Sequence, residues 1–97
     1  MTLNEYRDEA RRFMAAIGAG REPVSKILTW LDEETAALTD AATRDDRPML
    51  RHQVYDVLFL LFELAGRFDL DLDAEWSAGR GRKKVKYLNS RGSADGD

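Results

Sequence analysis

Apolar residues recur along this chain at the three- and four-residue spacing of an α-helix, and one segment dominates the pattern. Residues 49–68 (MLRHQVYDVLFLLFELAGRF) are strongly apolar, and Val57–Phe62 is an unbroken run of six apolar side chains. A helix that is apolar on all sides has to be covered on more than one side. The pattern therefore predicts a central helix that other helices, or a second copy of the chain, must cover.

A polar stripe interrupts this central segment. Asp56 and Glu63 are seven residues apart and share a helix face, with Gln53 and His52 on the same side one turn earlier. A buried carboxylate needs a cation, a hydrogen-bond donor or water, so Asp56 is either a metal ligand or the partner of a donor such as Arg51. For Glu63 we expect a carboxylate at the rim that reaches solvent or an arginine. For His52 we expect a position on the helix surface.

The preceding segments carry local signals for two further helices. Thr2, with Glu5 three residues later, forms a capping-box pattern before a first amphipathic stripe, and the glycines within 18–20 end that helix. Pro23 suits the first turn of a second helix, whose apolar stripe runs over 24–42.

Aspartates mark the boundaries of the remaining helices. Asp45 or Asp46 is expected to cap the central helix ahead of Pro48. The segment 69–73 (DLDLD) then reads as a loop and a cap that lead into a fourth helix, which runs to residue 88.

The fourth helix is the weakest of the set, because Gly79 and Gly81 predict a break or kink in it. No strand pattern and no internal repeat is visible, so the predicted fold class is all-α. We expect a four-helix bundle in a single domain over residues 1–88, followed by a disordered polar tail over residues 89–97.

Composition narrows the candidate chemistry. The chain has no cysteine and one histidine, which excludes disulfides, thiolate metal sites and His-rich metal clusters. A bound metal would have carboxylate ligands, which favours Mg²⁺ or Mn²⁺. The charged start and the short apolar runs indicate neither a signal peptide nor a membrane span, so we expect a soluble cytoplasmic protein with no membrane partner.

The second and third helices form the candidate site. In a bundle, acidic residues on facing helices can hold a hard cation between them. Glu34 lies at the edge of the second apolar stripe and is expected to face Asp56, with Gln53 beside it and Glu63 as a further candidate. Trp30 and Trp76 are expected to be packing residues, Trp30 in the core or at a subunit interface. Trp30 is one turn from Glu34, so the alternative for it is to stack on the base of a bound nucleotide.

Several of these segments resemble a known family. Residues 31–38 (LDEETAAL) resemble the first metal motif, E-x-x-E, of the MazG-like nucleotide pyrophosphohydrolases, and residues 50–65 resemble their second motif, E-x-x-D, with its apolar helix. The segment 67–72 (RFDLDL) and the opening ten residues also resemble the corresponding parts of small members. The resemblance covers roughly residues 2–88.

The resemblance implies an α-helical bundle that assembles as a dimer or larger oligomer and binds Mg²⁺ through four carboxylates. It implies cleavage of a nucleoside triphosphate between the α and β phosphates, giving a monophosphate and pyrophosphate. The metal ions would stabilise phosphate charge and lower the pKa of an attacking water. Carried over residue by residue, it assigns Glu34, Asp56 and Gln53 as metal ligands.

Two positions depart from the family pattern, because Ala37 and Gln53 stand where the family has glutamates. Glutamine can offer a carbonyl oxygen to Mg²⁺, whereas alanine offers none. Half of the ligand charge is therefore missing. Three hypotheses remain: an enzyme that binds one metal, a non-catalytic helical interaction or regulatory module, and a protein that binds a nucleotide without cleaving it.

The charge is unevenly distributed along the chain. Residues 79–91 hold six bases and no acid, whereas residues 1–78 carry a net charge of −7. In the family, basic residues after the core helices meet substrate phosphates, a role that the resemblance gives to Lys83 or Lys86. The alternatives are nucleic-acid binding, with Tyr87 stacking on a base, and a solvated helix end. The acidic remainder argues against nucleic acid as the main partner.

Overall fold

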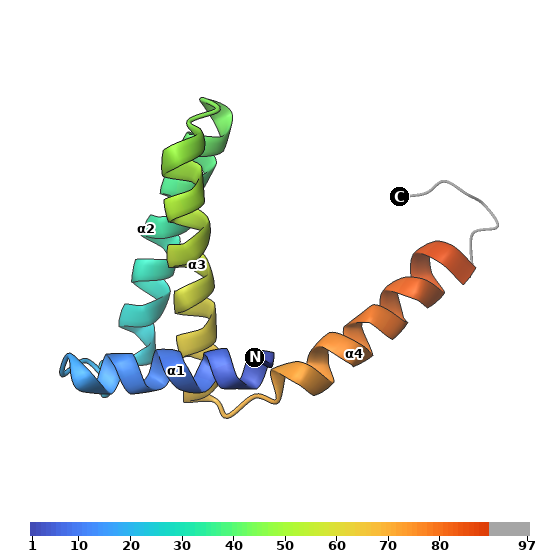
Figure 1. Cartoon of the computed structure of the whole chain (residues 1–97), viewed down its shortest axis with the longest axis horizontal. Helices are drawn as coiled ribbons and strands as arrows, with labels where there is room; N and C mark the ends of the chain where they lie inside the picture. Colours follow the sequence, from blue (N-terminus) through green and yellow to red (C-terminus); the bar gives the residue numbers. More distant parts are fainter. Residues whose placement is uncertain (90–97) are drawn as a thin grey trace.

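The computed structural model describes residues 1–89, and this part of the chain is helical throughout, apart from short connections (Figure 1). The helices are α1 (Leu3–Ala16), α2 (Val24–Thr43), α3 (Arg47–Arg67) and α4 (Leu72–Lys83), and α4 continues as a short π-helix, η1 (Lys84–Asn89). The described residues contain no strand, which confirms the all-α prediction. Most of the predicted polar tail, residues 90–97, lies outside the described residues. None of the described helices is both long and apolar enough to cross a membrane.

Three helices form the packed body of the protein. α2 and α3 run antiparallel and side by side, and α1 crosses the foot of this hairpin and packs on α3 (Figure 1). α4 starts beside the N-terminal end of α1 and then projects away from the body. The predicted four-helix bundle therefore has only three of its helices packed together within one chain.

Local capping signals set the helix starts as the sequence predicts. The Thr2 hydroxyl accepts a hydrogen bond from the Glu5 amide at 3.1 Å, and the Glu5 carboxylate accepts one from the Thr2 amide at 2.7 Å. Asp46 caps α3 and Asp71 caps α4, each through the amide three residues later. Pro23 stands at the N-cap of α2, immediately before its first turn. These contacts satisfy amides that a helix start leaves without partners.

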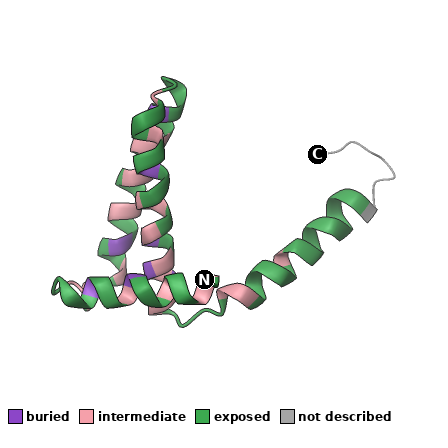
Figure 2. Ribbon diagram, viewed as in Figure 1, coloured by how far each residue is buried: buried purple, intermediate pink, exposed green. Residues whose placement is uncertain are grey.

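The hydrophobic core is small and lies where the three body helices meet. Met14, Ile27 and Leu60, one from each helix, are buried together. Leu58 and Leu61, from the apolar run in α3, remain 46% and 45% exposed. Figure 2 shows that burial is confined to the body and that α4 has no buried residue. α1 and α2 thus cover α3 only in part.

Hydrogen bonds fix the start of α4 to the start of α1. The Asp73 carboxylate accepts from the amides of Leu3 and Asn4 at 3.0 and 3.3 Å. The Asn4 side chain donates to Asp71 at 2.9 Å and accepts from the Leu72 amide at 2.7 Å. The hydrogen bond from Asn4, followed by one from the Ala74 amide, lowers the pKa of Asp71.

Within residues 1–89, α4 packs on α1 more than on α2 or α3. It passes through Gly79 and Gly81 as a continuous α-helix, so the predicted break does not occur there. The hydrogen-bonding pattern changes only at Lys84, where the π-helix begins.

Candidate functional site

Glu34 and Asp56 lie at the same height on two neighbouring antiparallel helices. Glu34 is nine residues before Thr43, the last residue of α2, and Asp56 is nine residues after Arg47, the first residue of α3. With a rise of about 1.5 Å per residue, both are roughly 13.5 Å from the turn that joins the helices. Both are partly buried, so neither stands on a fully exposed outer face.

Gln53 lies one helical turn before Asp56 and is only 8% exposed. Its amide nitrogen donates to the Met49 sulfur at 3.6 Å, whereas its Oε1 atom is buried with no hydrogen-bond partner among the described residues. A buried acceptor without a partner costs about 1–3 kcal/mol of stability. By the same counting from the turn, Ala37 is level with Gln53 and adds no polar atom. A cation or donor at this position would therefore stabilise the protein.

The Asp56 carboxylate is engaged on one oxygen only. His52 Nε2 lies 3.0 Å from Asp56 Oδ2, and the His52 side chain is 64% exposed, as predicted for a surface histidine. The side chain in contact with the Asp56 carboxylate is thus His52 rather than Arg51. The Glu34 carboxylate forms no hydrogen bond or ion pair with another described residue. Oxygen atoms of both carboxylates therefore remain available to a ligand.

The charge at this position is small. Within residues 1–89 there is no group of three or more histidine, aspartate or glutamate side chains that would hold a metal ion. Two carboxylates and one amide oxygen are the donors that α2 and α3 present. Mg²⁺ sites that hold the ion with one or two carboxylates leave the other coordination positions to phosphate and water.

The other predicted binding residues lie elsewhere in the chain. Lys83 and Lys86 are exposed on α4 and η1, which project from the body, so a single chain does not bring them to Glu34 or Asp56. Trp30 packs against the core, with the Lys26 ammonium 5.7 Å from its ring centre. Trp30 therefore follows the packing interpretation.

Glu63 is fully buried, so the prediction of a carboxylate at the rim is wrong, although the predicted arginine partner is present. Its Oε2 atom accepts hydrogen bonds from Arg11 of α1 and from Arg67, one turn later on α3, at 2.6 Å for Arg67. Asp56 lies about 10.5 Å away along α3, given seven residues at 1.5 Å each. Glu63 thus belongs to a separate ion-pair network and not to the candidate metal site.

This network holds the loop between α1 and α2. Arg67 donates to the carbonyl oxygens of Glu22 and Ala19, and Arg11 donates to that of Gly20 at 3.3 Å. The two guanidinium groups therefore join the loop to the foot of α3 around one buried carboxylate. The Glu63–Arg67 spacing of four residues is a signal in the sequence, whereas Arg11 is 52 residues from Glu63 and gives none.

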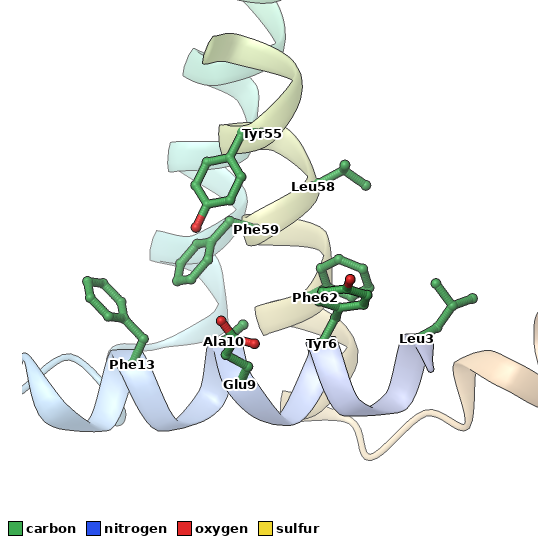
Figure 3. A pocket seen from close by; sticks show the side chains of 9 residues that line it. All are labelled: Leu3, Tyr6, Glu9, Ala10, Phe13, Tyr55, Leu58, Phe59 and Phe62. Carbon is green, nitrogen blue, oxygen red and sulfur yellow. The ribbon is translucent and has the colours of Figure 1, made fainter. Parts of the chain in front are cut away.

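A second candidate site is an open aromatic groove of about 460 Å³ between α1 and α3 (Figure 3). Tyr6 stacks on Phe62 with ring centroids 5.8 Å apart, and Phe13 meets Phe59 edge-on at 5.7 Å. Glu9 is the one carboxylate in its lining. We call this surface the α1/α3 groove; its lining residues are Leu3, Tyr6, Glu9, Ala10, Phe13, Tyr55, Leu58, Phe59 and Phe62.

The pattern of apolar residues in the sequence does not predict this groove. Its α1 residues belong to the first amphipathic stripe, which the pattern predicts to be packed. In the structure that stripe is wider than the surface that α3 covers, so its outer aromatic side chains remain exposed.

Comparisons with protein families, with curated proteins and with solved structures found no match for this chain. Function is therefore inferred from the side chains themselves. They offer two features: the partly buried oxygen donors on α2 and α3, and the aromatic groove between α1 and α3.

Proposed function

We propose that this protein is a MazG-like nucleotide pyrophosphohydrolase with a reduced metal site. In this proposal Glu34, Asp56 and the Gln53 amide oxygen hold one Mg²⁺ together with the phosphates of a nucleoside triphosphate. The observation that carries it is the buried Oε1 atom of Gln53, which has no partner among the described residues and lies one turn from Asp56. A cation, a donor or a water molecule would satisfy this acceptor, and the proposal assigns it to Mg²⁺.

The donor chemistry fits the ion. Mg²⁺ prefers hard oxygen ligands and is commonly bound by one or two carboxylates plus substrate phosphates, and Mn²⁺ accepts a similar set. Glu34 and Asp56 supply two negative charges where the family pattern has four. We therefore expect weak binding of Mg²⁺ alone and stronger binding when a nucleotide supplies further oxygen ligands.

The chain's own residues then have distinct roles. Glu34 and Asp56 bind and orient the ion, and the His52 imidazole, 3.0 Å from Asp56 Oδ2, helps to position the Asp56 carboxylate. When bound, Mg²⁺ neutralises phosphate charge and lowers the pKa of an attacking water, which is the chemistry needed to separate the α and β phosphates. Lys83 or Lys86 would meet the phosphates of a nucleotide held by another copy, because α4 and its continuation η1 project from the body of their own chain (Figure 1). The proposal therefore includes a dimer.

The first experiment is pyrophosphate release from a panel of nucleoside and deoxynucleoside triphosphates, with Mg²⁺ or with EDTA. We expect Mg²⁺-dependent release that Asp56→Asn abolishes. Asp40→Asn is the matched control, because Asp40 is an exposed carboxylate on α2 that is paired with Arg44. Equal activity in Asp56→Asn and Asp40→Asn would separate any activity from this site.

A second experiment restores the missing charge with the double change Ala37→Glu and Gln53→Glu. Without metal, the added carboxylates repel Glu34 and Asp56 and lower the melting temperature. With Mg²⁺ the variant should recover stability and bind the ion more tightly in calorimetry than the parent chain. If Mg²⁺ affinity is unchanged in the folded variant, these four positions do not face a common ion.

A non-catalytic interaction module is the second candidate, and the exposed α1/α3 groove is the observation that favours it. The candidate functions predict different responses of the protein to added nucleotide. Pyrophosphate release supports the enzyme. Thermal stabilisation by nucleotide and Mg²⁺ without product supports a nucleotide binder, and no response to either in a stable oligomer supports the interaction module.

A further inference from the structure

Large apolar side chains remain exposed on two separate surfaces of the described residues. On α1 and α3, Tyr6, Phe13 and Tyr55 are 44%, 53% and 64% exposed, and on α4 Trp76 is 66% exposed. Exposed apolar patches of this kind mark sites of protein interaction.

The projecting helix α4 carries an apolar surface that no other described part of the chain covers. Apart from Leu72, Asp73 and Gly79, every residue of α4 is exposed, and Trp76 is 66% exposed. The prediction that Trp76 packs is therefore not met within one chain. A shallow hollow along α4 and η1 combines the rings of Trp76 and Tyr87 with the bases Arg80, Lys83 and Lys84, and with one acid, Glu75. We call this surface the α4 stripe.

The α1/α3 groove is the matching uncovered surface on the body. It is aromatic like the α4 stripe but carries the opposite charge, since Glu9 is the one charged residue in its lining. The lengths also agree. The groove follows α1 from Leu3 to Phe13, about 15 Å, and the stripe runs from Trp76 to Tyr87, about 16 Å, at 1.5 Å per residue.

The α4 stripe cannot reach the groove of its own chain while the α1–α4 junction is intact. The bonds from Leu3 and Asn4 to Asp73 hold the start of α4 beside the N-terminus of α1, and from there α4 leads away from the groove (Figure 1). A second copy can present its stripe without breaking these bonds. Exchange of this kind is reciprocal, so it closes a two-fold dimer with two identical contacts.

We propose that two copies of this chain assemble by exchanging α4, so that the α4 stripe of each copy occupies the α1/α3 groove of the other. Trp76 is the aromatic anchor of each contact, and Lys83 or Arg80 lies near Glu9. The proposed function also requires a dimer, but the exchange is argued from the two apolar surfaces and not from nucleotide binding, so a dimer without pyrophosphate release would support the exchange and count only against the proposed function.

Sedimentation equilibrium of the full chain over a range of concentrations tests the proposal, and the expected species is a dimer. Trp76→Ala should raise the dimer dissociation constant at least about tenfold, as expected for an anchoring tryptophan. Leu61→Ala is the matched control, because Leu61 is a 45% exposed residue of α3 that does not line the groove. Glu9→Lys and Lys83→Glu should each weaken the dimer, and the two changes combined should restore part of the affinity.

A mixing experiment tests exchange directly. Tyr55→Ala damages the groove and Trp76→Ala damages the stripe, so each variant alone has two defective contacts. A mixed dimer has one intact contact, because the undamaged groove of one variant receives the undamaged stripe of the other. We expect more dimer in the mixture than in either variant alone.

Four results would overturn the exchange. One is a monomer at all concentrations. This holds even if the α4 stripe of that monomer binds a single-stranded oligonucleotide through Trp76, because the stripe would then have a different occupant. Another is a monomer in which Trp76 fluoresces as a buried indole, because α4 would then have folded back onto its own chain. The emission of Trp76 is obtained by subtracting the spectrum of Trp76→Phe from that of the parent chain. The others are a dimer weakened by Leu61→Ala but not by Trp76→Ala, and a mixture that dimerises no better than its components.

Discussion

The buried carboxylate of Glu63 allows the most quantitative prediction. Its side chain is fully buried and is shared by Arg67, which is 11% exposed, and Arg11, which is 32% exposed. In Glu63→Gln the charge that balances both guanidinium groups is removed while the shape is kept. Removing one member of a buried ion pair costs about 3–5 kcal/mol, because the remaining charge stays buried without a partner.

The expected cost for Glu63→Gln is at the lower end of that range, about 3 kcal/mol. Arg11 can partly rehydrate, and glutamine retains one acceptor oxygen. A change of 1 kcal/mol shifts the melting temperature of a domain of this size by about 4–8 °C, so we expect a loss of roughly 12–24 °C. Urea unfolding followed by circular dichroism at 222 nm measures the free energy, and a thermal scan measures the shift.

The exposed ion pair between Asp40 and Arg44 provides the control for this prediction. Asp40→Asn removes the exposed pair with Arg44, whose side chains are 64% and 61% exposed, and should cost less than about 0.5 kcal/mol. Combining Glu63→Gln with Arg67→Met should cost less than the sum of the single changes, since each exposes the same missing partner. A cost for Glu63→Gln below about 1 kcal/mol, or equal to the control, would show that this ion pair does not hold the loop to α3.

Three further predictions concern backbone and capping. In Gly66→Ala the new Cβ would overlap Arg11 Cγ, so overpacking should outweigh the gain of about 1 kcal/mol in helix propensity. In Gly81→Ala nothing lies within 4 Å of the new Cβ, so this change should stabilise the protein. Comparative urea melts test both. Thr2→Ala removes half of the capping box and should cost about 1 kcal/mol in the same melts. The pKa of Asp71 is lowered from its ordinary value of 3.8, so its contribution to stability is present above about pH 4 and is lost as the pH falls through the lowered pKa. The stability difference between the parent chain and Asp71→Asn should therefore shrink in unfolding curves recorded at progressively lower pH, and a constant difference would contradict this.

The helix starts were predictable from sequence because their causes are local. Thr2 with Glu5, Asp46 and Asp71 each act on an amide three residues away, so short patterns contain the whole interaction. The shared height of Glu34 and Asp56 also follows from counting residues on either side of one turn.

Features that depend on distant segments were not predictable in the same way. Glu63 is buried because Arg11, 52 residues earlier, and Arg67 both reach it, and no local pattern encodes the first of these contacts. The exposure of Trp76 depends on where α4 points, which is set by hydrogen bonds to α1 some 70 residues away. Apolar periodicity identifies a face that needs covering but does not identify the segment, or the copy, that covers it.

The bonds from Asp73 to the first amides of α1 have a consequence for the order of folding. A helix of 14 residues is marginal by itself in water, and two of the amides that open α1 find their acceptor only in a residue near the other end of the domain. During synthesis α1 leaves the ribosome before residue 73 and must wait for that residue before its opening turn is secured. A chain cut short before that residue would leave α1 frayed at its first turn, although the hairpin of α2 and α3 would be complete.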